Sequence, residues 1–168
     1  MPGRTLAHSL ASPLPMRLHH SGSYVYFALK GDCFDPAEVT THLGVAPTRT
    51  WQKGDTSTFG NHQWKYSGWV LSTAKGTEPL DIDRLVTEIV DQLHDRTEAI
   101  LAVKKQLGLN SVLEIVLYVD VNEEASTPAL GHDLRTLDFL SRTRTITDVD
   151  IYRYDSGNED YLGIPSFE

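Results

Sequence analysis

The residue types best suited to chemistry are concentrated between Arg49 and Trp69. All three tryptophans of the chain fall in this stretch, beside a tyrosine and several cations. Aromatic rings next to positive charges are typical of binding hot spots and of stacking surfaces. The candidate ligand- or partner-binding residues are Arg49, Trp51, Lys53, Trp64, Lys65 and Trp69.

Two interpretations of this segment stay open. On a strand, alternate side chains point to opposite faces, so Trp64 and Tyr66 share one face while Lys65 and Trp69 share the other. In the first interpretation, Trp69 lies in the core and Trp51 or Trp64 caps the edge of a sheet. In the second, a groove between the Trp51 segment and the Trp64 strand binds a small ligand or an anion, with Arg49, Lys53 and Lys65 as the counter-charges.

A second candidate is a group of carboxylates near the end of the chain. Asp148 and Asp150 are two residues apart on a predicted strand, so their side chains share a face. With Glu114 or Asp120 from a neighbouring strand they would form an acidic cluster. Paired carboxylates hold Mg²⁺ or Ca²⁺, or divide the roles of acid and base. The alternative is a solvated strand face.

Other kinds of site find little support. Cys33 is the only cysteine, so no internal disulfide can form, and the flanking Asp32 and Asp35 would raise the pKa of its thiol. We expect Cys33 to be a small packed residue. The seven histidines show no metal-ligand spacing, and no phosphate-binding loop or GxSxG motif occurs. We therefore expect no metal site and no cofactor.

Charge narrows the choice of partners. The 168-residue chain has a formal net charge of −8, and most of its 23 acidic residues follow residue 80. An acidic surface repels a phosphate backbone, so nucleic acid is a disfavoured partner. No apolar run is long enough to span a membrane or to serve as a secretory signal, which favours a cytoplasmic protein.

The two ends of the chain differ from the middle. Residues 1–23 are rich in Pro, Ser and His and contain no acidic residue, which predicts a disordered tail. Met16 is an alternative start. Residues 155–168 form an acidic tail that can pack through Tyr161, Leu162, Ile164 and Phe167. A single domain is expected between them, over residues 24–154.

The predicted elements alternate between strands and helices. Asp35 as N-cap, Pro36 at the first helical position and Gly44 after the last turn define a short helix. Apolar residues at helical spacing predict a long helix from Asp81 to Leu107, with a bend between His94 and Glu98. Strands are predicted at Tyr24–Lys30, Thr48–Lys53, Trp64–Thr73, Ser111–Val121 and Thr145–Tyr154, and a last helix at His132–Arg142.

The resulting order is β-α-β-β-α-β-α-β. We interpret it as an α+β fold with a mostly antiparallel sheet and helices packed on one face, in the manner of ferredoxin-like folds. The alternation of Ile146, Val149 and Ile151 with aspartates predicts a half-buried last strand. The first or the last strand could lie at a sheet edge and pair across a two-fold axis, so monomer and homodimer both stay open.

Several motifs occur together along the chain. Gly31-Asp32 and Asp35-Pro36 follow the first strand, and they are succeeded by HLGVAPTRTWQKGD, GWVLST and DVDIYRY. In this combination the chain resembles the bacterial domain of unknown function 4279 family, over roughly Tyr24 to Tyr152. The resemblance implies a small intracellular bacterial protein. It transfers no catalytic residue, because no activity is established for the family.

Three functions follow from these observations, in decreasing order of support. The first is a non-catalytic protein-interaction domain, such as an inhibitor or immunity-type partner of a basic toxin surface. The second is a small-ligand or anion-binding module that uses the Trp-rich segment. The third is a metal-dependent enzyme that uses the acidic cluster, so enzymatic activity is the less favoured class.

Overall fold

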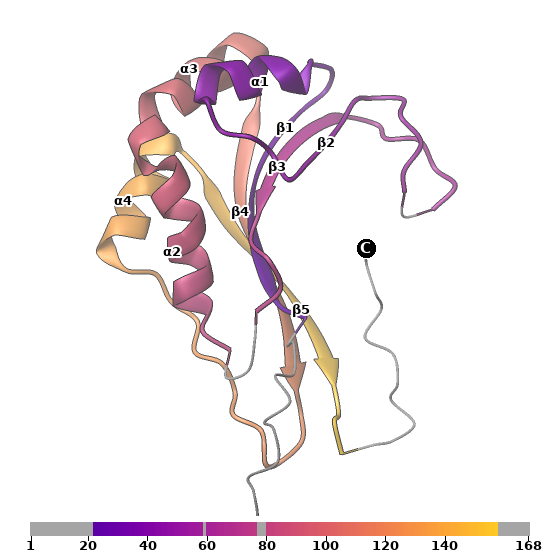
Figure 1. The fold of residues 1–168 in the computed structure, drawn as a ribbon, viewed down its shortest axis with the longest axis vertical. Coiled ribbons are helices and arrows are strands. Elements are labelled where there is room, and N and C mark those ends of the chain that lie inside the picture. Colours follow the sequence, from indigo (N-terminus) through magenta and orange to yellow (C-terminus); the bar gives the residue numbers. More distant parts are fainter. Residues whose placement is uncertain (1–21, 59, 77–79, 158–168) are drawn as a thin grey trace, which may run out of the picture.

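The computed structural model describes residues 22–58, 60–76 and 80–157. Residues 1–21 and 158–168 of the predicted tails, including Met16 and the apolar residues after Asp160, lie outside the described residues. The elements follow the predicted order (Figure 1). They are β1 (Tyr24–Gly31), α1 (Pro36–Leu43), β2 (Arg49–Trp51), β3 (Ser67–Ser72), α2 (Ile82–Leu93), the 3₁₀ helix η1 (His94–Arg96), α3 (Thr97–Leu107), β4 (Asn110–Asp120), α4 (Leu134–Thr143) and β5 (Ile146–Tyr154).

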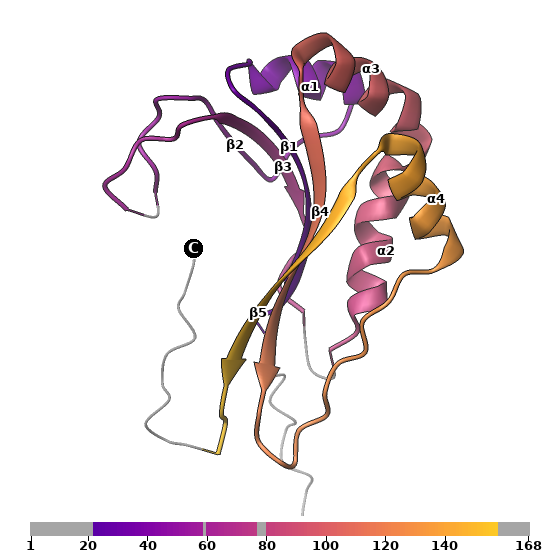
Figure 2. The ribbon, with the colours of Figure 1, turned by 180° about the vertical axis from the view of Figure 1, so that it is seen from behind.

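The strands form one five-stranded sheet in the order β2-β3-β1-β4-β5. The β1–β3, β1–β4 and β2–β3 pairs are antiparallel, whereas β4 and β5 are parallel. The α-helices lie on one side of the curved sheet, and the view from behind shows the same separation (Figures 1 and 2). The predicted α+β class and the mostly antiparallel sheet are therefore confirmed.

The core lies between the helices and the sheet. Val25, Phe27 and Leu29 of β1 are fully buried and face the helices, as alternate residues of a strand must. They belong to one apolar cluster with residues from β3, β4 and all four α-helices. Trp69 is fully buried in this cluster, and its Nε1 donates to Thr40 Oγ1 of α1 at 3.1 Å.

Local signals set the helix boundaries. The Asp35 carboxylate accepts a hydrogen bond from the backbone N–H of Ala37 at 2.9 Å, and Gly44 ends α1 with φ 64°. The predicted bend in the long helix is confirmed, because η1 separates α2 from α3. The Thr97 hydroxyl donates to the backbone carbonyl of His94 at 2.8 Å at this break.

Lys104 connects α3 to the elements beside it. Its ammonium donates to Ser111 Oγ at 2.6 Å and to the backbone carbonyls of Thr143 and Arg144 at 2.8 and 2.9 Å. Burial, followed by the charge of Arg144, lowers the pKa of this ammonium. The three bonds join the C-terminal end of α3 to the start of β4 and to the end of α4, and so fix where β5 begins.

Two predictions about the strands need correction. The third strand begins at Ser67 rather than Trp64, because Trp64 lies in a segment that folds back on Asp55 through a backbone hydrogen bond of 2.9 Å. The last strand is largely exposed rather than half-buried, because α4 packs against α2 and α3 instead of over β5. Of the two strands predicted as possible sheet edges, the last strand, β5, is one, whereas β1 pairs with both β3 and β4.

The face of the sheet without helices is shaped by a close contact at Gly68. The register pairs Gly68 of β3 with Trp51 of β2. A Cβ atom on Gly68 would lie 2.2 Å from Trp51 Cζ2, so only glycine admits the indole at this position. Trp51 is consequently 6% exposed although it belongs to an edge strand.

Replacing Gly68 by alanine should therefore destabilise the protein. The added methyl group must displace the Trp51 ring, and overpacking of this kind costs about 1–3 kcal/mol of unfolding free energy. Urea denaturation followed by circular dichroism measures the change. Gly131→Ala is the matched control, because a Cβ there meets no atom within 4 Å. Equal stabilities of the two variants would contradict the close contact.

Candidate functional site

No described helix covers the second face of the sheet, which we call the open face (Figures 1 and 2). Its residues follow from the strand register: Tyr26 of β1 pairs with Glu114 of β4, which pairs in turn with Asp148 of β5. Residues paired in this way point to the same side of a sheet. The open face carries Tyr24, Tyr26, Arg49, Trp51, Glu114, Tyr118, Asp148, Asp150 and Tyr152.

An aromatic cluster of Trp51, Trp64 and Tyr66 occupies the β2 side of the open face. The rings of Trp51 and Trp64 stack with centroids 4.5 Å apart and an interplanar angle of 24°. Tyr66 meets both rings edge-on, at 5.8 and 5.6 Å. The Arg49 guanidinium lies 5.1 Å from the centroid of the Trp51 ring, which is within cation–π range. The segment before β3 therefore folds over the end of the sheet.

This geometry separates the six predicted binding residues. Arg49, Trp51 and Trp64 come together, and Lys65 is exposed beside them in the sequence. Trp69 lies under α1 on the helix side and cannot contribute to the open face. Lys53 forms an ion pair with Asp32 at 2.6 Å. The rings of Trp51 and Trp64, whose segments were predicted to border a groove, stack on each other.

The predicted acidic cluster is present in part. Glu114 pairs in register with Asp148, and Asp150 pairs with the next open-face residue of β4, so three carboxylates share the face. Asp120 lies at the C-terminal end of β4, six residues beyond Glu114, where it accepts hydrogen bonds from the backbone N–H groups of Asn122 and Ser156 at 3.1 and 3.0 Å. The described residues contain no group of His, Cys, Asp or Glu side chains arranged to hold a metal ion.

Glu114 is a buried carboxyl group of this cluster, and its pKa is raised. Its residue is 6% exposed, and burial raises its pKa, as do the charges of Asp150 and Asp148. The charge of Lys30 and a hydrogen bond with Tyr26 oppose the rise. Burial and then the nearby Glu114 carboxylate raise the pKa of the Tyr26 hydroxyl far above its usual value. The carboxyl group on the central part of the open face is thus one whose charged form is disfavoured.

Further tyrosines extend the open face toward β5. The rings of Tyr118 and Tyr152 stack at 5.0 Å with an interplanar angle of 19°, and those of Tyr24 and Tyr26 lie 6.1 Å apart. These tyrosines are not among the six binding residues predicted from the sequence. The alternation of Tyr24 and Tyr26 on one strand was the available signal, but which rings lie beside one another depends on strand pairing.

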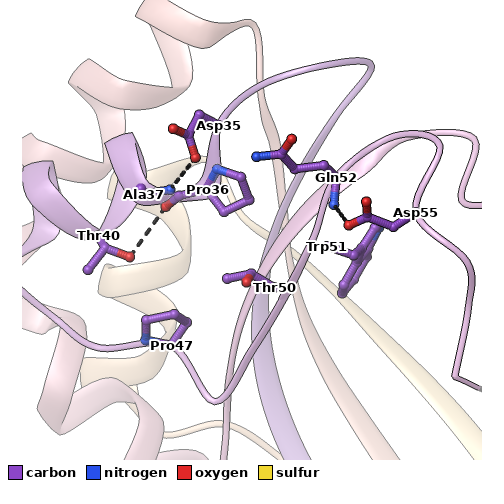
Figure 3. A pocket seen from close by; sticks show the side chains of 9 residues that line it. All are labelled: Asp35, Pro36, Ala37, Thr40, Pro47, Thr50, Trp51, Gln52 and Asp55. Atoms are coloured by element: carbon purple, nitrogen blue, oxygen red, sulfur yellow. Dashed lines mark hydrogen bonds between the residues drawn. The ribbon is translucent and has the colours of Figure 1, made fainter.

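A separate pocket lies where α1 begins (Figure 3). It has a volume of about 390 Å³ and is lined by Asp35, Pro36, Ala37, Thr40, Pro47, Thr50, Trp51, Gln52 and Asp55. Its two carboxylates already bind the chain's own backbone, since Asp35 caps α1 and Asp55 Oδ2 accepts from Gln52 N at 2.7 Å. None of the open-face carboxylates lines it.

Cys33 is not the packed residue that was expected. Its side chain is exposed, and the adjacent Phe34 takes the buried position instead. The backbone N–H of Phe34 donates to the buried Ser67 Oγ at 3.3 Å, which holds the turn after β1 against the start of β3.

These features define an α+β domain with helices on one face of its sheet and an aromatic and acidic surface on the other. The family model described as Domain of unknown function (DUF4279) matches residues 20–154, most of the chain. The chain belongs to this family, which confirms the resemblance. Comparisons with curated proteins and with solved structures gave no match. Among the described helices, none has the length and apolar character needed to cross a bilayer.

The raised pKa of Glu114 predicts a pH-dependent stability. The folded protein holds this proton more tightly than the unfolded chain does, whose glutamate pKa is about 4.3. The contribution of the protonated Glu114 to the free energy of unfolding is therefore complete below that pH, and it is lost as the pH rises through the pKa of Glu114 in the folded protein. Glu114→Gln should be more stable than the wild type at about pH 7, and the difference should vanish near pH 3.

Urea denaturation at both pH values measures this difference. The control is Glu88→Gln, which removes an exposed carboxylate from α2. A Glu114→Gln variant that is less stable than the wild type at neutral pH would show that the ionised carboxylate stabilises the fold.

Proposed function

We propose that this chain is a non-catalytic protein-interaction domain of the cytoplasm and that its partner docks on the open face. The observation that carries the proposal is the open face itself. It carries aromatic rings from Trp64 to Tyr152 and three carboxylates; Trp51, Tyr118 and Glu114 are buried, and Asp148, Asp150 and Tyr152 are exposed. Aromatic side chains on a rigid sheet are frequent anchors of protein interfaces.

Charge supports a basic partner, as expected of an inhibitor or immunity-type protein that binds a basic toxin surface. The chain carries a net charge of −8, and the carboxylates of Glu114, Asp148 and Asp150 face the same side. Complementary charges accelerate encounter and exclude wrong partners. The enzymatic alternative has less support, because these carboxylates lie on an open strand surface and outside the pocket beside α1.

Small-ligand binding is the second candidate. It is favoured by Trp51 Nε1, a buried donor that has no hydrogen-bond partner among the described residues. An unsatisfied buried donor costs about 1–3 kcal/mol, and a ligand acceptor that reached it would recover part of this. Trp64 stacks on the face of the Trp51 ring, whereas the N–H of Trp51 lies in the plane of that ring.

We also propose that the first four strands form a ferredoxin-like unit to which α4 and β5 are added. The antiparallel order β2-β3-β1-β4 supports this, as do the helices that connect β1 to β2 and β3 to β4. The parallel strand β5 then extends the open face beyond that unit.

Substitution of Trp64 by alanine should weaken partner binding by roughly tenfold or more, the loss expected of an aromatic anchor. Affinity purification from the native host with the full chain as bait identifies the partner, and calorimetry with the purified partner measures the dissociation constant. Binding should weaken between about 0.05 and 0.3 M salt, because screening reduces attraction between opposite charges.

Glu38→Ala is the control for this experiment, because Glu38 is exposed on α1, on the helix side of the sheet. The proposal is wrong if purification yields no stoichiometric protein, or if the two variants bind the partner equally well. A response of tryptophan fluorescence to nucleotides, sugars or anions, lost in Trp51→Phe, would instead support the small-ligand candidate.

A further inference from the structure

β5 is a long edge strand. It comprises nine residues and pairs with β4 along one side, and no described strand pairs with its other side. The opposite edge of the sheet is formed by β2, which is only three residues long. An unpaired strand of this length presents a row of backbone N–H and C=O groups to which another strand can be added.

β5 carries several exposed apolar side chains. Every large hydrophobic side chain that is exposed among the described residues falls between positions 121 and 152: Val121, Leu130, Leu134, Leu137, Ile146, Ile151 and Tyr152. The last three belong to β5 and are 67%, 60% and 42% exposed. Exposed apolar side chains on a strand with an unpaired edge indicate an interaction site.

The backbone of β5 leaves alternate N–H groups pointing outward. The backbone carbonyl of Tyr154 accepts a hydrogen bond from the backbone N–H of Val121, the residue that follows β4. The backbone N–H of Val149 donates to the Asp148 carboxylate instead of to β4. Because successive residues of a strand direct their amides to opposite edges, the N–H of Ile151 points outward with that of Val149. An added strand would replace the bond between Val149 and Asp148 and free that carboxylate.

The two faces of β5 differ in chemistry. Asp148 and Asp150 point to the open face beside Glu114, whereas Val149 and Ile151 point to the helix side beside Ile115 and Leu117. At the centre of β5, an added strand would therefore meet carboxylates on one face and apolar side chains on the other. Ile146 and Tyr152 flank the carboxylates on the open face, and Arg153 follows Ile151 on the helix side. Opposite charges and apolar pairs in cross-strand positions each stabilise a sheet.

We propose that β5 binds an extended segment of a partner protein as a sixth strand, and that this segment alternates basic and apolar residues. The proposal rests on the proposed function and names the chemistry of the partner. The basic side chains lie over Asp148, Asp150 and Glu114, and the apolar ones cover Ile151 on the helix side. Main-chain hydrogen bonds supply affinity, and the alternation supplies specificity.

A second copy of this chain fits the edge less well. An antiparallel pairing of two β5 strands about their centres would set Asp150 against Asp150 of the second copy, beside two Glu114 carboxylates. Like charges directly opposite each other destabilise a strand pair. Charge complementarity thus favours a cationic segment over self-association.

The probe is a labelled synthetic peptide as long as β5, nine residues, in which lysine and valine alternate. Fluorescence anisotropy with the full chain should detect binding at low salt, and a peptide that alternates glutamate and valine should not bind. Ile151→Pro should weaken binding by roughly tenfold or more, because proline at an outward amide removes no bond to β4 but blocks an added strand. Ile151→Val, which retains both the amide and an apolar β-branched side chain, is the matched control.

Hydrogen exchange provides a test that needs no variant. Binding of the lysine–valine peptide to the wild-type chain should slow exchange of the Ile151 amide, while amides of α1 keep their rates. The inference is overturned if both peptides bind alike, if the Ile151→Pro protein folds and binds normally, or if the Ile151 amide gains no protection. A homodimer that Ile151→Pro dissociates would also overturn it, in favour of self-pairing.

The identified partner separates this inference from the proposed function. A partner that loses affinity for Trp64→Ala but not for Ile151→Pro would retain the open face as the docking surface and exclude strand addition. A partner that is insensitive to both substitutions would contradict both proposals.

Discussion

The pairing of β1 on both of its sides is the constraint on which the rest of the structure depends. Because β3 and β4 both align with β1, its alternate residues serve two different environments. Val25, Phe27 and Leu29 hold the helices against one face, while Tyr24 and Tyr26 point to the other. A change of one residue in register would exchange these two sets and place tyrosine hydroxyls in the helix-side core.

The open face is stabilised without a second layer of helices. Stacking of Trp64 over Trp51 shields apolar area at the β2 side, and Gly68 allows the indole to lie directly on the backbone of β3. Toward β5, the rings of the tyrosines cover apolar parts of the sheet, and each ring also carries a polar hydroxyl group. Aromatic rings that are only partly buried retain surface for a partner, which links the stability of this face to its proposed use.

Tertiary contacts also decide which charged side chains lie near the aromatic rings of the open face. Lys53, the nearest lysine to Trp51 in the sequence, is engaged by Asp32 from the turn after β1. Arg49 instead lies over the Trp51 ring, where it lowers the pKa values of Tyr24 and Tyr26 against the larger effect of their burial. On β5, the carboxylates of Asp148 and Asp150 meet Glu114 because a parallel strand places them in register. Arg49 and Lys53, which are close in the sequence, therefore have different partners.

The sequence by itself determined the class of fold, the order of its elements and the boundaries that depend on short-range chemistry. The cap at Asp35, the glycine stop at Gly44 and the break after Leu93 are local effects, since each involves residues within a few positions. Only the tertiary structure decided that β5 lies at an edge of the sheet and that Lys53 forms an ion pair with Asp32. It also decided that the rings of Trp51 and Trp64 stack on each other. These outcomes depend on which strands pair and which face the helices cover, and such contacts join residues far apart in the chain.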